Sequence, residues 1–517
     1  MNPPIDRPTD CPTDRPAGLA ALEARLREDL AWLELPARSW VPPCTHEGRP
    51  VVSVAIVGGG MAGLAAAASL THLGVDAVIF DQSPQGFEGP WATTARMETL
   101  RSPKQLTGPA LGLPALTFRA WFEAQFGSEA WRALDKIPRL QWMDYLRWYR
   151  DVLGLDVRND HRITSIVPHD DGNGDGVVAL SVSHAGRDDV VYARHVVLAT
   201  GRDGLGGPSA PAFAQALPRR FWAHSSDDMD YAALRGKRVG VVGAGASAMD
   251  SAATALEAGA ASVDLLIRRA DIPRVNKGKG AGNPGLTHGH ATLPDTWKWR
   301  IRHYVNVQQV PPPRGSTLRV SRHANARFNL GSPILDATVA GDALHVRTPN
   351  GLFELDFLVF ATGFSIDPAS RPEFASFARH IRTWSDRYTP PAGDEDRELA
   401  DSPDLGPAFE FREKTPGACP GLERIHCFCA PATLSHGALS GDIPAVSDGA
   451  KRLALGLAAA LYRDDIELHY ANLEAFDEPE VFGDEWTPAG PPAALATPAA
   501  PAAPAEPSAL PEPERLP

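Results

Sequence analysis

The chain has few cysteines, no long apolar segment and no concentrated basic stretch. Its five cysteines in 517 residues show neither a C-x-x-C dithiol nor the paired spacing of a disulfide framework, which favours a reducing, cytoplasmic compartment. The longest continuous apolar run outside a glycine-rich loop, 453–462, is too short to span a bilayer. The amino-terminal residues 1–16 lack the apolar core of a signal peptide. We therefore expect no membrane association.

The shortage of basic residues excludes a further class of protein. Lys and Arg number 50 against 63 Asp and Glu, which gives a net charge of -13 and a pI near 5.7. A nucleic-acid partner requires a dense Lys/Arg face that neutralises phosphates, and no stretch of the sequence supplies one. We expect a small-molecule substrate instead, and the sequence leaves the oligomeric state open, with a homodimer as one option.

Proline is the residue present in excess, and its placement matters more than its total of 48. Five prolines fall within 1–16 and ten within 488–517, so the sequence predicts disordered tails over 1–16 and 487–517. Between the first tail and the body, 17–44 is predicted to be a helix and a linker, because leucines recur at helical spacing: Leu19, Leu22, Leu26, Leu30 and Leu33.

The first glycine motif, GGGMAG at 58–63, lies between a Val/Ile-rich strand at 51–57 and an alanine-rich helix at 64–73. In this context Gly58 allows a tight turn, Gly60 lets the backbone approach a pyrophosphate, and Gly63 lets helix and strand pack closely. A second strand at 75–80 ends at Asp81, whose carboxylate is predicted to accept hydrogen bonds from ribose hydroxyls. The pattern predicts a bound dinucleotide.

A second glycine motif repeats this arrangement 185 residues later. The segment 238–250 contains Gly243, Gly245, Ser247 and Ala248 in the pattern G-x-G-x-x-A, again between a strand and a helix. The next strand, 262–267, ends in a pair of arginines in place of an acid: Arg268 and Arg269. Because arginine binds a 2'-phosphate that a carboxylate would repel, this second site is predicted to prefer NADPH over NADH.

Two dinucleotide sites in one chain suit hydride transfer from NADPH to a tightly held FAD. The order of GGGMAG, HVVLATG (195–201), GAGASA (243–248) and FLVFATGF (357–364) resembles that of two-dinucleotide-binding flavoproteins. Within these, the chain is most similar to the class B flavin monooxygenases, which include flavin-containing, N-hydroxylating and Baeyer-Villiger enzymes. The resemblance covers roughly residues 50–465.

The resemblance implies an α/β fold with two Rossmann-like domains, in which the NADPH domain is inserted into a discontinuous FAD domain. The expected FAD domain comprises 45–215 and 335–475, and the expected NADPH domain comprises 216–334 with an insertion at 272–313. The insertion carries the residues expected to face substrate: Asn276, Lys277, His288, His290, Trp297 and Trp299. Two histidines with no third ligand nearby favour a loop over a metal site.

The resemblance also implies roles for residues outside the glycine loops. Each A-T-G segment is expected to form a crossing between the domains, with Thr200, Gly201, Thr362 and Gly363 close to cofactor. Trp91, in a segment similar to G-G-x-W, is expected beside the flavin. A charged segment at 96–109 and a loop before a helix near 444 are expected to contribute the candidate catalytic residues: Arg101, Lys104 and His436.

The chemistry that the resemblance implies is a monooxygenation. NADPH reduces FAD, the reduced flavin captures O2 as a C4a-(hydro)peroxide, and one oxygen atom passes to a small organic substrate. The motifs leave open heteroatom oxygenation, ring hydroxylation of a heteroaromatic such as urate, and Baeyer-Villiger insertion. Around His224 the Baeyer-Villiger signature is reduced to its histidine, which weakens the last option. More remote alternatives are a disulfide reductase-like enzyme using Cys427 and Cys429, and a non-catalytic flavoprotein.

Overall fold

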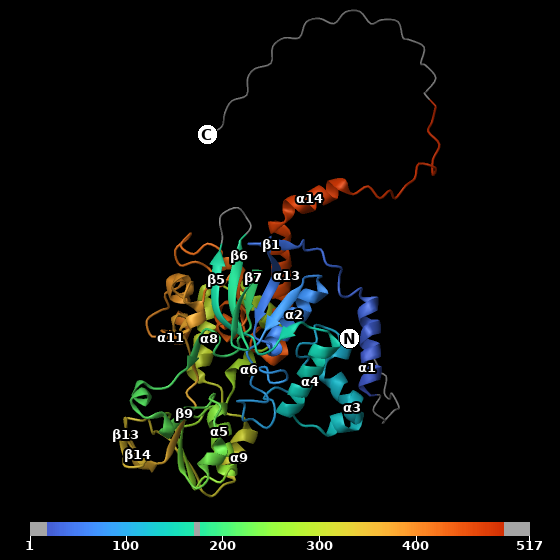
Figure 1. Cartoon of the computed structure of the whole chain (residues 1–517). Coiled ribbons are helices and arrows are strands. Elements are labelled where there is room, and N and C mark those ends of the chain that lie inside the picture. The colour runs from blue at the N-terminus through green and yellow to red at the C-terminus, as the bar shows by residue number, and fades with distance from the viewer. Residues whose placement is uncertain (1–17, 170–175, 491–517) are drawn as a thin grey trace, which may run out of the picture. The chain divides into compact units, whose positions relative to one another are not determined.

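The computed structural model describes residues 18–169 and 176–490 (Figure 1). The predicted amino-terminal helix is confirmed as α1 (Leu19–Trp32), with Leu26 buried. The predicted tail at 1–16 lies outside the described residues, as does the tail at 487–517 beyond residue 490. By contacts, the chain divides into one unit that ends at Asp465 and a second that begins at Ile466.

The first sheet of the larger unit has eight strands. Strands β4, β3, β2, β7, β6 and β5 follow one another in that order, β1 pairs with β2, and β18 pairs with β7. Pairing is parallel between neighbours in the series β4, β3, β2, β7 and β18. Strands β5, β6 and β7 form an antiparallel meander. The strands span Cys44–His46 (β1), Arg49–Val57 (β2), Ala77–Phe80 (β3), Val157–Arg158 (β4), Arg162–His169 (β5), Val177–His184 (β6), Arg187–Leu198 (β7) and Ile425–Cys427 (β18).

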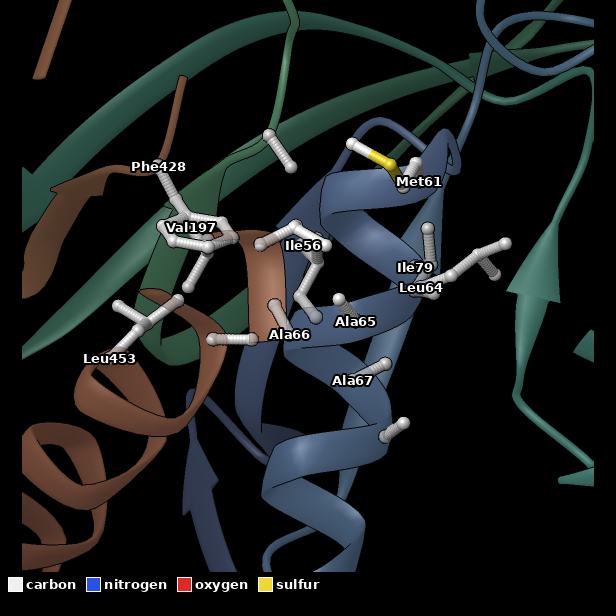
Figure 2. Packing of buried hydrophobic residues seen from close by; sticks show 14 of the residues in the cluster. Ile56, Met61, Leu64, Ala65, Ala66, Ala67, Ile79, Val197, Phe428 and Leu453 are labelled. Atoms are coloured by element: carbon white, nitrogen blue, oxygen red, sulfur yellow. The ribbon is translucent and has the colours of Figure 1, made fainter. Parts of the chain in front are cut away.

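Helices cover the parallel part of this sheet because their small residues permit close packing. The first is α2 (Met61–His72), whose alanines at 65–68 are almost fully buried against strands β2 and β3. Figure 2 shows the side chains of Ile56 and Val197 packed between α2 and the helix that carries Leu453, which is α13 (Val446–Asp464). The packing holds the carboxyl ends of β2, β3, β7 and β18 at one edge, where ligands of parallel sheets bind.

The second sheet has five parallel strands in the order β12, β11, β10, β16, β9. The strands span Trp222–His224 (β9), Arg238–Val242 (β10), Ser262–Leu266 (β11), Ala326–Asn329 (β12) and Phe357–Phe360 (β16). Helix α5 (Ala246–Glu257) follows β10 and buries Ala248, Met249 and Ala252 in the core of this half. The two glycine motifs therefore begin two separate nucleotide-type folds.

The expected boundary between 334 and 335 needs correction. Strand β16 pairs with β10 in the second sheet, and a three-stranded antiparallel sheet precedes it in the chain: β13 (Asp336–Ala340), β14 (Ala343–Thr348) and β15 (Gly351–Leu355). Leu344 and Leu355 from this small sheet share a hydrophobic core with Phe360. Because that core would be exposed without them, residues 336–360 pack with the second half of the chain.

Two short strands mark the crossings between the halves. Strand β8 (Gly206–Pro208) follows the first A-T-G segment, and β17 (Phe364–Ile366) follows the second. They pair antiparallel, and a Cβ atom on Gly206 would lie 2.0 Å from the carbonyl oxygen of Ser365. The two connections therefore run side by side as one narrow link.

The remaining helices lie on the peripheries of the two sheets and in the segments between them. They span Phe118–Ala133 (α3), Arg139–Val152 (α4), Lys277–Ala281 (α6), Pro284–Gly289 (α7), Asp295–Gln308 (α8), Arg314–Ser321 (α9), Trp384–Arg387 (α10), Arg397–Asp401 (α11) and Thr433–His436 (α12). In the second unit, α14 (Ile466–Ala475) has no buried residue. Within the described ranges, none of the helices has both the length and the apolarity needed to cross a membrane.

Candidate active site

The first glycine of each loop abuts the A-T-G segment of its own half. A Cβ atom on Gly58 would lie 2.6 Å from the carbonyl oxygen of Ala199, and one on Gly243 would lie 2.7 Å from that of Ala361. Both glycines also have positive φ, at 108° and 132°. Only glycine fits these two positions, so each loop and its A-T-G segment form one structural unit at the strand edge.

The space in front of the next motif glycine is open in both halves. Among the described residues, a Cβ atom on Gly60 would meet only Gly89, at 3.8 Å, and one on Gly245 would meet nothing within 4 Å. Each of these glycines is the N-cap of the helix that follows, and no described side chain caps either helix. The first backbone N–H groups of both helices are therefore available to an anion, as pyrophosphate binding requires.

The last position of the two motifs explains how each helix packs on its strand. A Cβ atom on Gly63 would lie 1.9 Å from the carbonyl oxygen of Gly58, so the first loop excludes any side chain there. In the second loop Ala248 is fully buried, and its methyl group is tolerated. Its neighbour Ser247 is exposed in the first turn of α5, where its hydroxyl can reach a ligand at the helix start.

The carboxylate of Asp81 holds the first loop in shape. One oxygen accepts the N–H of Gly59 at 2.6 Å and the other accepts that of Ser83 at 2.7 Å. A second acid, Glu88, lies beside it and was not predicted as a site residue. Glu88 accepts from Arg150 at 2.8 Å and from Asn159 at 2.6 Å. Its seven-residue separation from Asp81 gave no signal in the sequence, because the loop between them follows no regular period.

A cavity of about 360 Å³ opens beside this loop. Gly59 and Glu88 form one wall, and α4 forms the other with Leu146, Arg147 and Arg150. The cavity therefore combines a glycine loop, a buried carboxylate and two guanidinium groups. These are groups that suit the sugar and phosphate parts of a nucleotide.

The segment expected to cover the flavin does lie against the first loop. The Cβ position of Gly89 is 3.7 Å from the Cα atom of Gly60. Trp91 is partly buried, and its ring meets that of Trp142 edge to face at 6.4 Å. Arg139 donates to the carbonyl oxygen of Trp91, which anchors the backbone of this segment to α4.

The two arginines after β11 are both exposed at the carboxyl edge of the second sheet. Arg269 donates to the carbonyl oxygen of Val307 at 2.9 Å and so ties the strand end to α8. Arg268 makes no hydrogen bond or ion pair within the described part of the chain. Its guanidinium is therefore the freer of the two to bind a phosphate.

The crossings hold their threonines by local hydrogen bonds. Thr200 donates to the carbonyl oxygen of Gly204 at 3.3 Å, and Thr362 donates to that of Ser209. The carbonyl oxygen of Gly201 accepts the N–H of Ala430 at 3.2 Å, which places the crossing beside the segment that follows β18. Gly363 has a positive φ of 84° and no atom within 4 Å of its Cβ position in the described structure.

Lys104, one of the predicted catalytic candidates, is held by backbone carbonyl groups. Its ammonium group donates to the carbonyl oxygens of Trp131 at 2.6 Å and Leu134, at the carboxyl end of α3. A cation there satisfies carbonyl groups that the helix leaves unpaired. Arg101 is placed differently. It forms an ion pair of 3.6 Å with Asp250 of α5 and so links the two halves of the chain.

His436 is also held by the protein itself. Its ring stacks on Phe409 with centroids 3.9 Å apart, and Nε2 contacts the carbonyl oxygen of Gly406 at 2.9 Å. Burial lowers the pKa of His436 to about 3, so the imidazole is neutral and a poor proton donor. These contacts fix the loop before α13.

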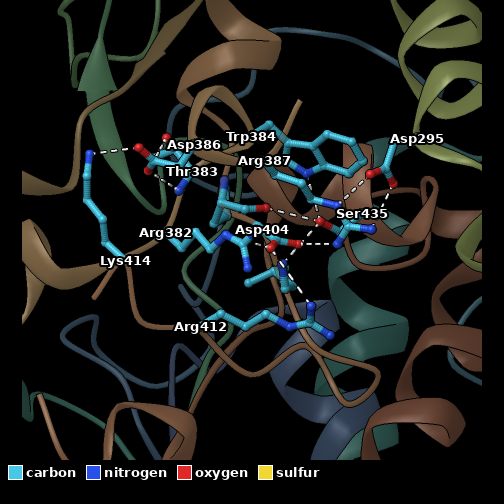
Figure 3. A network of polar contacts seen from close by, with 12 residues as sticks. Asp295, Arg382, Thr383, Trp384, Asp386, Arg387, Asp404, Arg412, Lys414 and Ser435 are labelled. Carbon is cyan, nitrogen blue, oxygen red and sulfur yellow. Dashed lines mark hydrogen bonds and ion pairs between the residues drawn. The ribbon is translucent and has the colours of Figure 1, made fainter. Parts of the chain in front are cut away.

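A polar network holds Ser435, the residue before His436. Ser435 accepts from the indole N–H of Trp384 at 3.0 Å and donates to the carbonyl oxygen of Pro403 at 3.0 Å. Figure 3 shows this serine beside Asp404, which is fully buried and accepts from Arg387 at 2.7 Å. The network balances the charge of the buried Asp404 with the guanidinium groups of Arg387, Arg382 and Arg412.

The insertion is largely helical and packs on the loop of His436. Asn276 caps α6 by accepting the N–H of Lys279 at 3.0 Å, and Lys277 begins that helix. His290 is buried and contacts the carbonyl oxygen of Leu434 at 3.0 Å, whereas His288 is exposed. The two histidines therefore do not converge.

The two insertion tryptophans also differ. Trp299 is almost fully buried and donates to the carbonyl oxygen of Asp394 at 2.8 Å, so it belongs to a local core. Trp297 is half exposed.

The sulfur atoms of Cys427 and Cys429 lie 3.5 Å apart in the interior beside the first crossing. Burial raises the pKa of Cys427, which disfavours the reactive thiolate that a disulfide reductase needs.

Two protein-family models match the chain. One is described as L-lysine 6-monooxygenase/L-ornithine 5-monooxygenase and matches residues 130–280, and the other is described as FAD-NAD(P)-binding and matches residues 55–203. The FAD-NAD(P)-binding match contains the first glycine loop and the first crossing. The monooxygenase match contains the second glycine loop.

A curated relative covers most of the chain. The FAD-dependent urate hydroxylase of Xanthomonas campestris pv. campestris is 40% identical over 470 residues, which are 90% of this chain and 98% of that protein. Solved structures share the fold at lower identity. The ornithine hydroxylase of Pseudomonas aeruginosa has a TM-score of 0.63 and 16% identity over 80% of this chain and all of that one. The ornithine N-hydroxylase of Kutzneria sp. 744 has a TM-score of 0.61 and 18% identity over 79% of this chain and 99% of that one.

Proposed function

This chain belongs to the flavin-dependent monooxygenase family of its Xanthomonas relative, and we propose that the molecule it oxygenates is a purine of the urate type. As a family member it is an FAD- and NAD(P)H-dependent oxidoreductase that transfers one atom of O2 to a small molecule. The observation that carries the choice of substrate is the 40% identity with a urate hydroxylase over 98% of that protein.

We assign FAD to the first loop. Gly58 and Gly63 satisfy the packing of the loop, while Gly60 leaves room for the pyrophosphate at the start of α2. The adenosine part is assigned to the cavity that Gly59 and Glu88 line, with Asp81 assigned to the ribose hydroxyls, since each of its oxygens keeps a lone pair beyond the one N–H that it accepts. Bound FAD supplies the chemistry that activates O2.

We assign NADPH to the second loop. Gly243, Gly245 and Ala248 shape the loop, and Ser247 lies exposed in the first turn of α5. Arg268 is assigned to the 2'-phosphate, with Arg269 supporting the strand end next to it. The pairing of β8 with β17 joins the two connections between the halves. Thr200, Gly201, Thr362 and Gly363, which precede these strands, are assigned to the junction that both cofactors reach.

The protein contributes binding, orientation and exclusion of water to the reaction. Trp91 lies in the segment that packs against the first loop, and its indole ring is assigned to the flavin. His436 remains neutral and holds the loop before α13, whose amino terminus favours negative charge nearby. No residue in this assignment serves as a general acid.

A substrate screen tests the proposal. The FAD-loaded enzyme is incubated with NADPH and O2, and NADPH oxidation is followed with urate, xanthine, L-ornithine or L-lysine. We expect urate to accelerate NADPH oxidation and to be consumed in a one-to-one ratio with it. Acceleration by L-ornithine or L-lysine but not by urate would instead support amine hydroxylation, as in the description of the matching family model.

A further inference from the structure

Helix α8 carries large apolar side chains on a face that its own chain leaves uncovered. Trp297, Tyr304 and Val307 are 50%, 50% and 49% exposed. Together with Arg300 they recur at intervals of three and four residues, which places all four on one side of the helix. The guanidinium of Arg300 lies over the Trp297 ring, 5.2 Å from its centroid. These four residues form the α8 stripe, an exposed apolar surface of the kind that binds another protein segment.

The opposite face of α8 is already occupied by the acidic residues before α11. Trp299 donates to the carbonyl oxygen of Asp394 at 2.8 Å, and Asn306 donates to the carboxylate of Asp396 at 3.0 Å. Trp299 and Asn306 each follow a member of the α8 stripe by two residues, which is about half a turn of helix. The acids before α11 therefore contact the side of α8 that faces away from the stripe.

The exposed charges of the segment that carries α8 are positive. Helix α6 lies beside α8, since a Cβ atom on Gly278 would be 3.6 Å from the Cγ1 atom of Val305. Both acids within 271–314 already form ion pairs with arginines. The exposed basic side chains of this range that form no ion pair in the described structure are Lys277, Lys279, Arg300 and Arg314. The stripe therefore lies in a segment with surplus positive charge.

The carboxyl-terminal unit has the opposite charge and is equally uncovered. Residues 466–486 contain seven Asp and Glu and no Lys or Arg. Helix α14 has no buried residue, and its Ile466, Tyr470 and Leu473 recur at the spacing that places them on one side of a helix. After the helix, Phe476 and Trp486 are 68% and 57% exposed. The segment thus combines an apolar helix face with a strong negative charge.

We propose that residues 466–486 of one copy of this chain dock on the α8 stripe of a second copy. The apolar side of α14 packs on Trp297, Tyr304 and Val307, as the side-chain ridges of one helix fit the grooves of another. The acids of the segment pair with the basic side chains of 271–314. Each copy gives its segment and receives that of its partner, so the assembly closes as a symmetric dimer.

Charge decides which surfaces meet in this dimer. Pairing α14 with α14 would bring two segments of seven acids together, and pairing α8 with α8 would bring Arg300 against Arg300. Only the crossed pairing of segment with stripe joins opposite charges. It also covers the apolar side chains of both surfaces with one kind of contact, made twice.

The test uses full-length, FAD-loaded protein and measures its mass by sedimentation equilibrium. One variant disables the stripe with Trp297→Glu and Tyr304→Glu, which repel an acidic segment. Another disables the segment with Leu473→Lys and Phe476→Lys, which repel a basic surface. Leu352→Glu is the matched control, because Leu352 is 63% exposed on β15. FAD content and thermal unfolding show whether each variant is folded.

We expect the mass of the wild type to rise with concentration to twice 55.3 kDa. Each double variant should raise the dissociation constant of the dimer by about 10-fold or more, because aromatic side chains at the centre of an interface carry much of its binding energy. Leu352→Glu should match the wild type. A wild type that stays at 55.3 kDa, or a dimer that neither folded variant weakens, would overturn the proposal.

Mixing the two double variants separates a second copy from any other occupant of the stripe. In the mixed dimer, one contact joins an intact segment to an intact stripe. The other contact joins the introduced lysines to the introduced glutamates, which attract each other. We therefore expect the equal mixture to dimerise more tightly than either variant alone. A mixture that associates no more than its components would show that the segment does not bind the stripe of a second copy.

Discussion

Arg101 and Asp250 form an ion pair across the two halves of the molecule, with 3.6 Å between Nη2 of the arginine and Oδ2 of the aspartate. Asp250 is buried in α5, the helix that starts at the second glycine loop. Arg319 of α9 approaches its other oxygen to 3.8 Å. The pair therefore connects the segment after Trp91 to the helix that we assign to NADPH.

Replacing this arginine should slow the delivery of hydride without releasing FAD. We predict that Arg101→Gln lowers the rate of flavin reduction by NADPH several-fold, because α5 loses a contact that fixes its position. Anaerobic mixing with NADPH, followed by flavin absorbance, measures this rate directly. Arg119→Gln, an exposed change on α3, is the matched control. A reduction rate equal to that of the wild type would show that the ion pair has no positioning role.

Alanine substitutions at two glycines of the first loop should have different effects, one on stability and the other on FAD binding. Gly63→Ala places a Cβ atom 1.9 Å from a backbone oxygen, so we predict a strongly destabilised protein. Gly60→Ala meets only Gly89 at 3.8 Å, so the chain should fold normally but lose FAD, because the methyl group occupies the pyrophosphate space.

Thermal unfolding and the ratio of flavin to protein absorbance separate these outcomes. If Gly60→Ala retains full FAD, the pyrophosphate does not lie at this glycine. A Gly63→Ala variant as stable as the wild type would contradict the close contact between Gly63 and the carbonyl oxygen of Gly58.

The choice of nicotinamide cofactor depends on a charge at the end of β11. We predict that Arg268→Ala raises the KM for NADPH about 10-fold or more while changing the KM for NADH little, because only NADPH carries the 2'-phosphate. Steady-state kinetics with both cofactors gives the comparison. Arg327→Ala, on the neighbouring strand β12, removes an exposed arginine at a distance from the strand end. Equal increases for both cofactors would assign Arg268 a structural role.

Features with a regular spacing were predicted well from the sequence. Both strand-loop-helix units were confirmed, because buried parallel strands and alanine-rich helices leave strong patterns. Strand β16 of the second sheet was predicted to belong to the FAD domain, which is the other half of the chain. Its sequence, FLVF, reads as a buried strand in either sheet, and only the pairing of β16 with β10 decides between them.

The contacts of single charged residues could not be predicted from the sequence, because their partners come from distant segments. Lys104 binds carbonyl groups near residue 131, and His436 stacks on Phe409. Glu88 was missed for the same reason. A lone charge carries no periodic signal, and its role depends on whether the fold supplies a partner.

A buried histidine pair should make the protein sensitive to acid. Nδ1 of His195 lies 3.1 Å from Nε2 of His426, and burial lowers the pKa of both, that of His426 to about 4. Between pH 6.5 and pH 4 the side chain of His426 binds a proton in the unfolded chain but stays neutral in the folded protein. Stability should therefore be full above pH 6.5 and fall through this window, by about 3 kcal/mol for this one group.

Chemical denaturation at pH 7 and pH 4.5 checks the sign and the source of this effect. We expect His426→Gln to lose less stability between the two pH values than the wild type does. His288→Gln, at an exposed position, should behave like the wild type. Equal losses in His426→Gln and the wild type would place the acid sensitivity elsewhere.

Labelled oxygen tests the central claim most directly. The enzyme, loaded with FAD, is supplied with NADPH, urate and ¹⁸O₂, and the purine-derived product is examined by mass spectrometry. We predict one ¹⁸O atom in that product for each NADPH oxidised, with little hydrogen peroxide formed. Full conversion of O₂ to hydrogen peroxide, with no label in any product of urate, would contradict the assignment of this chain as a purine monooxygenase.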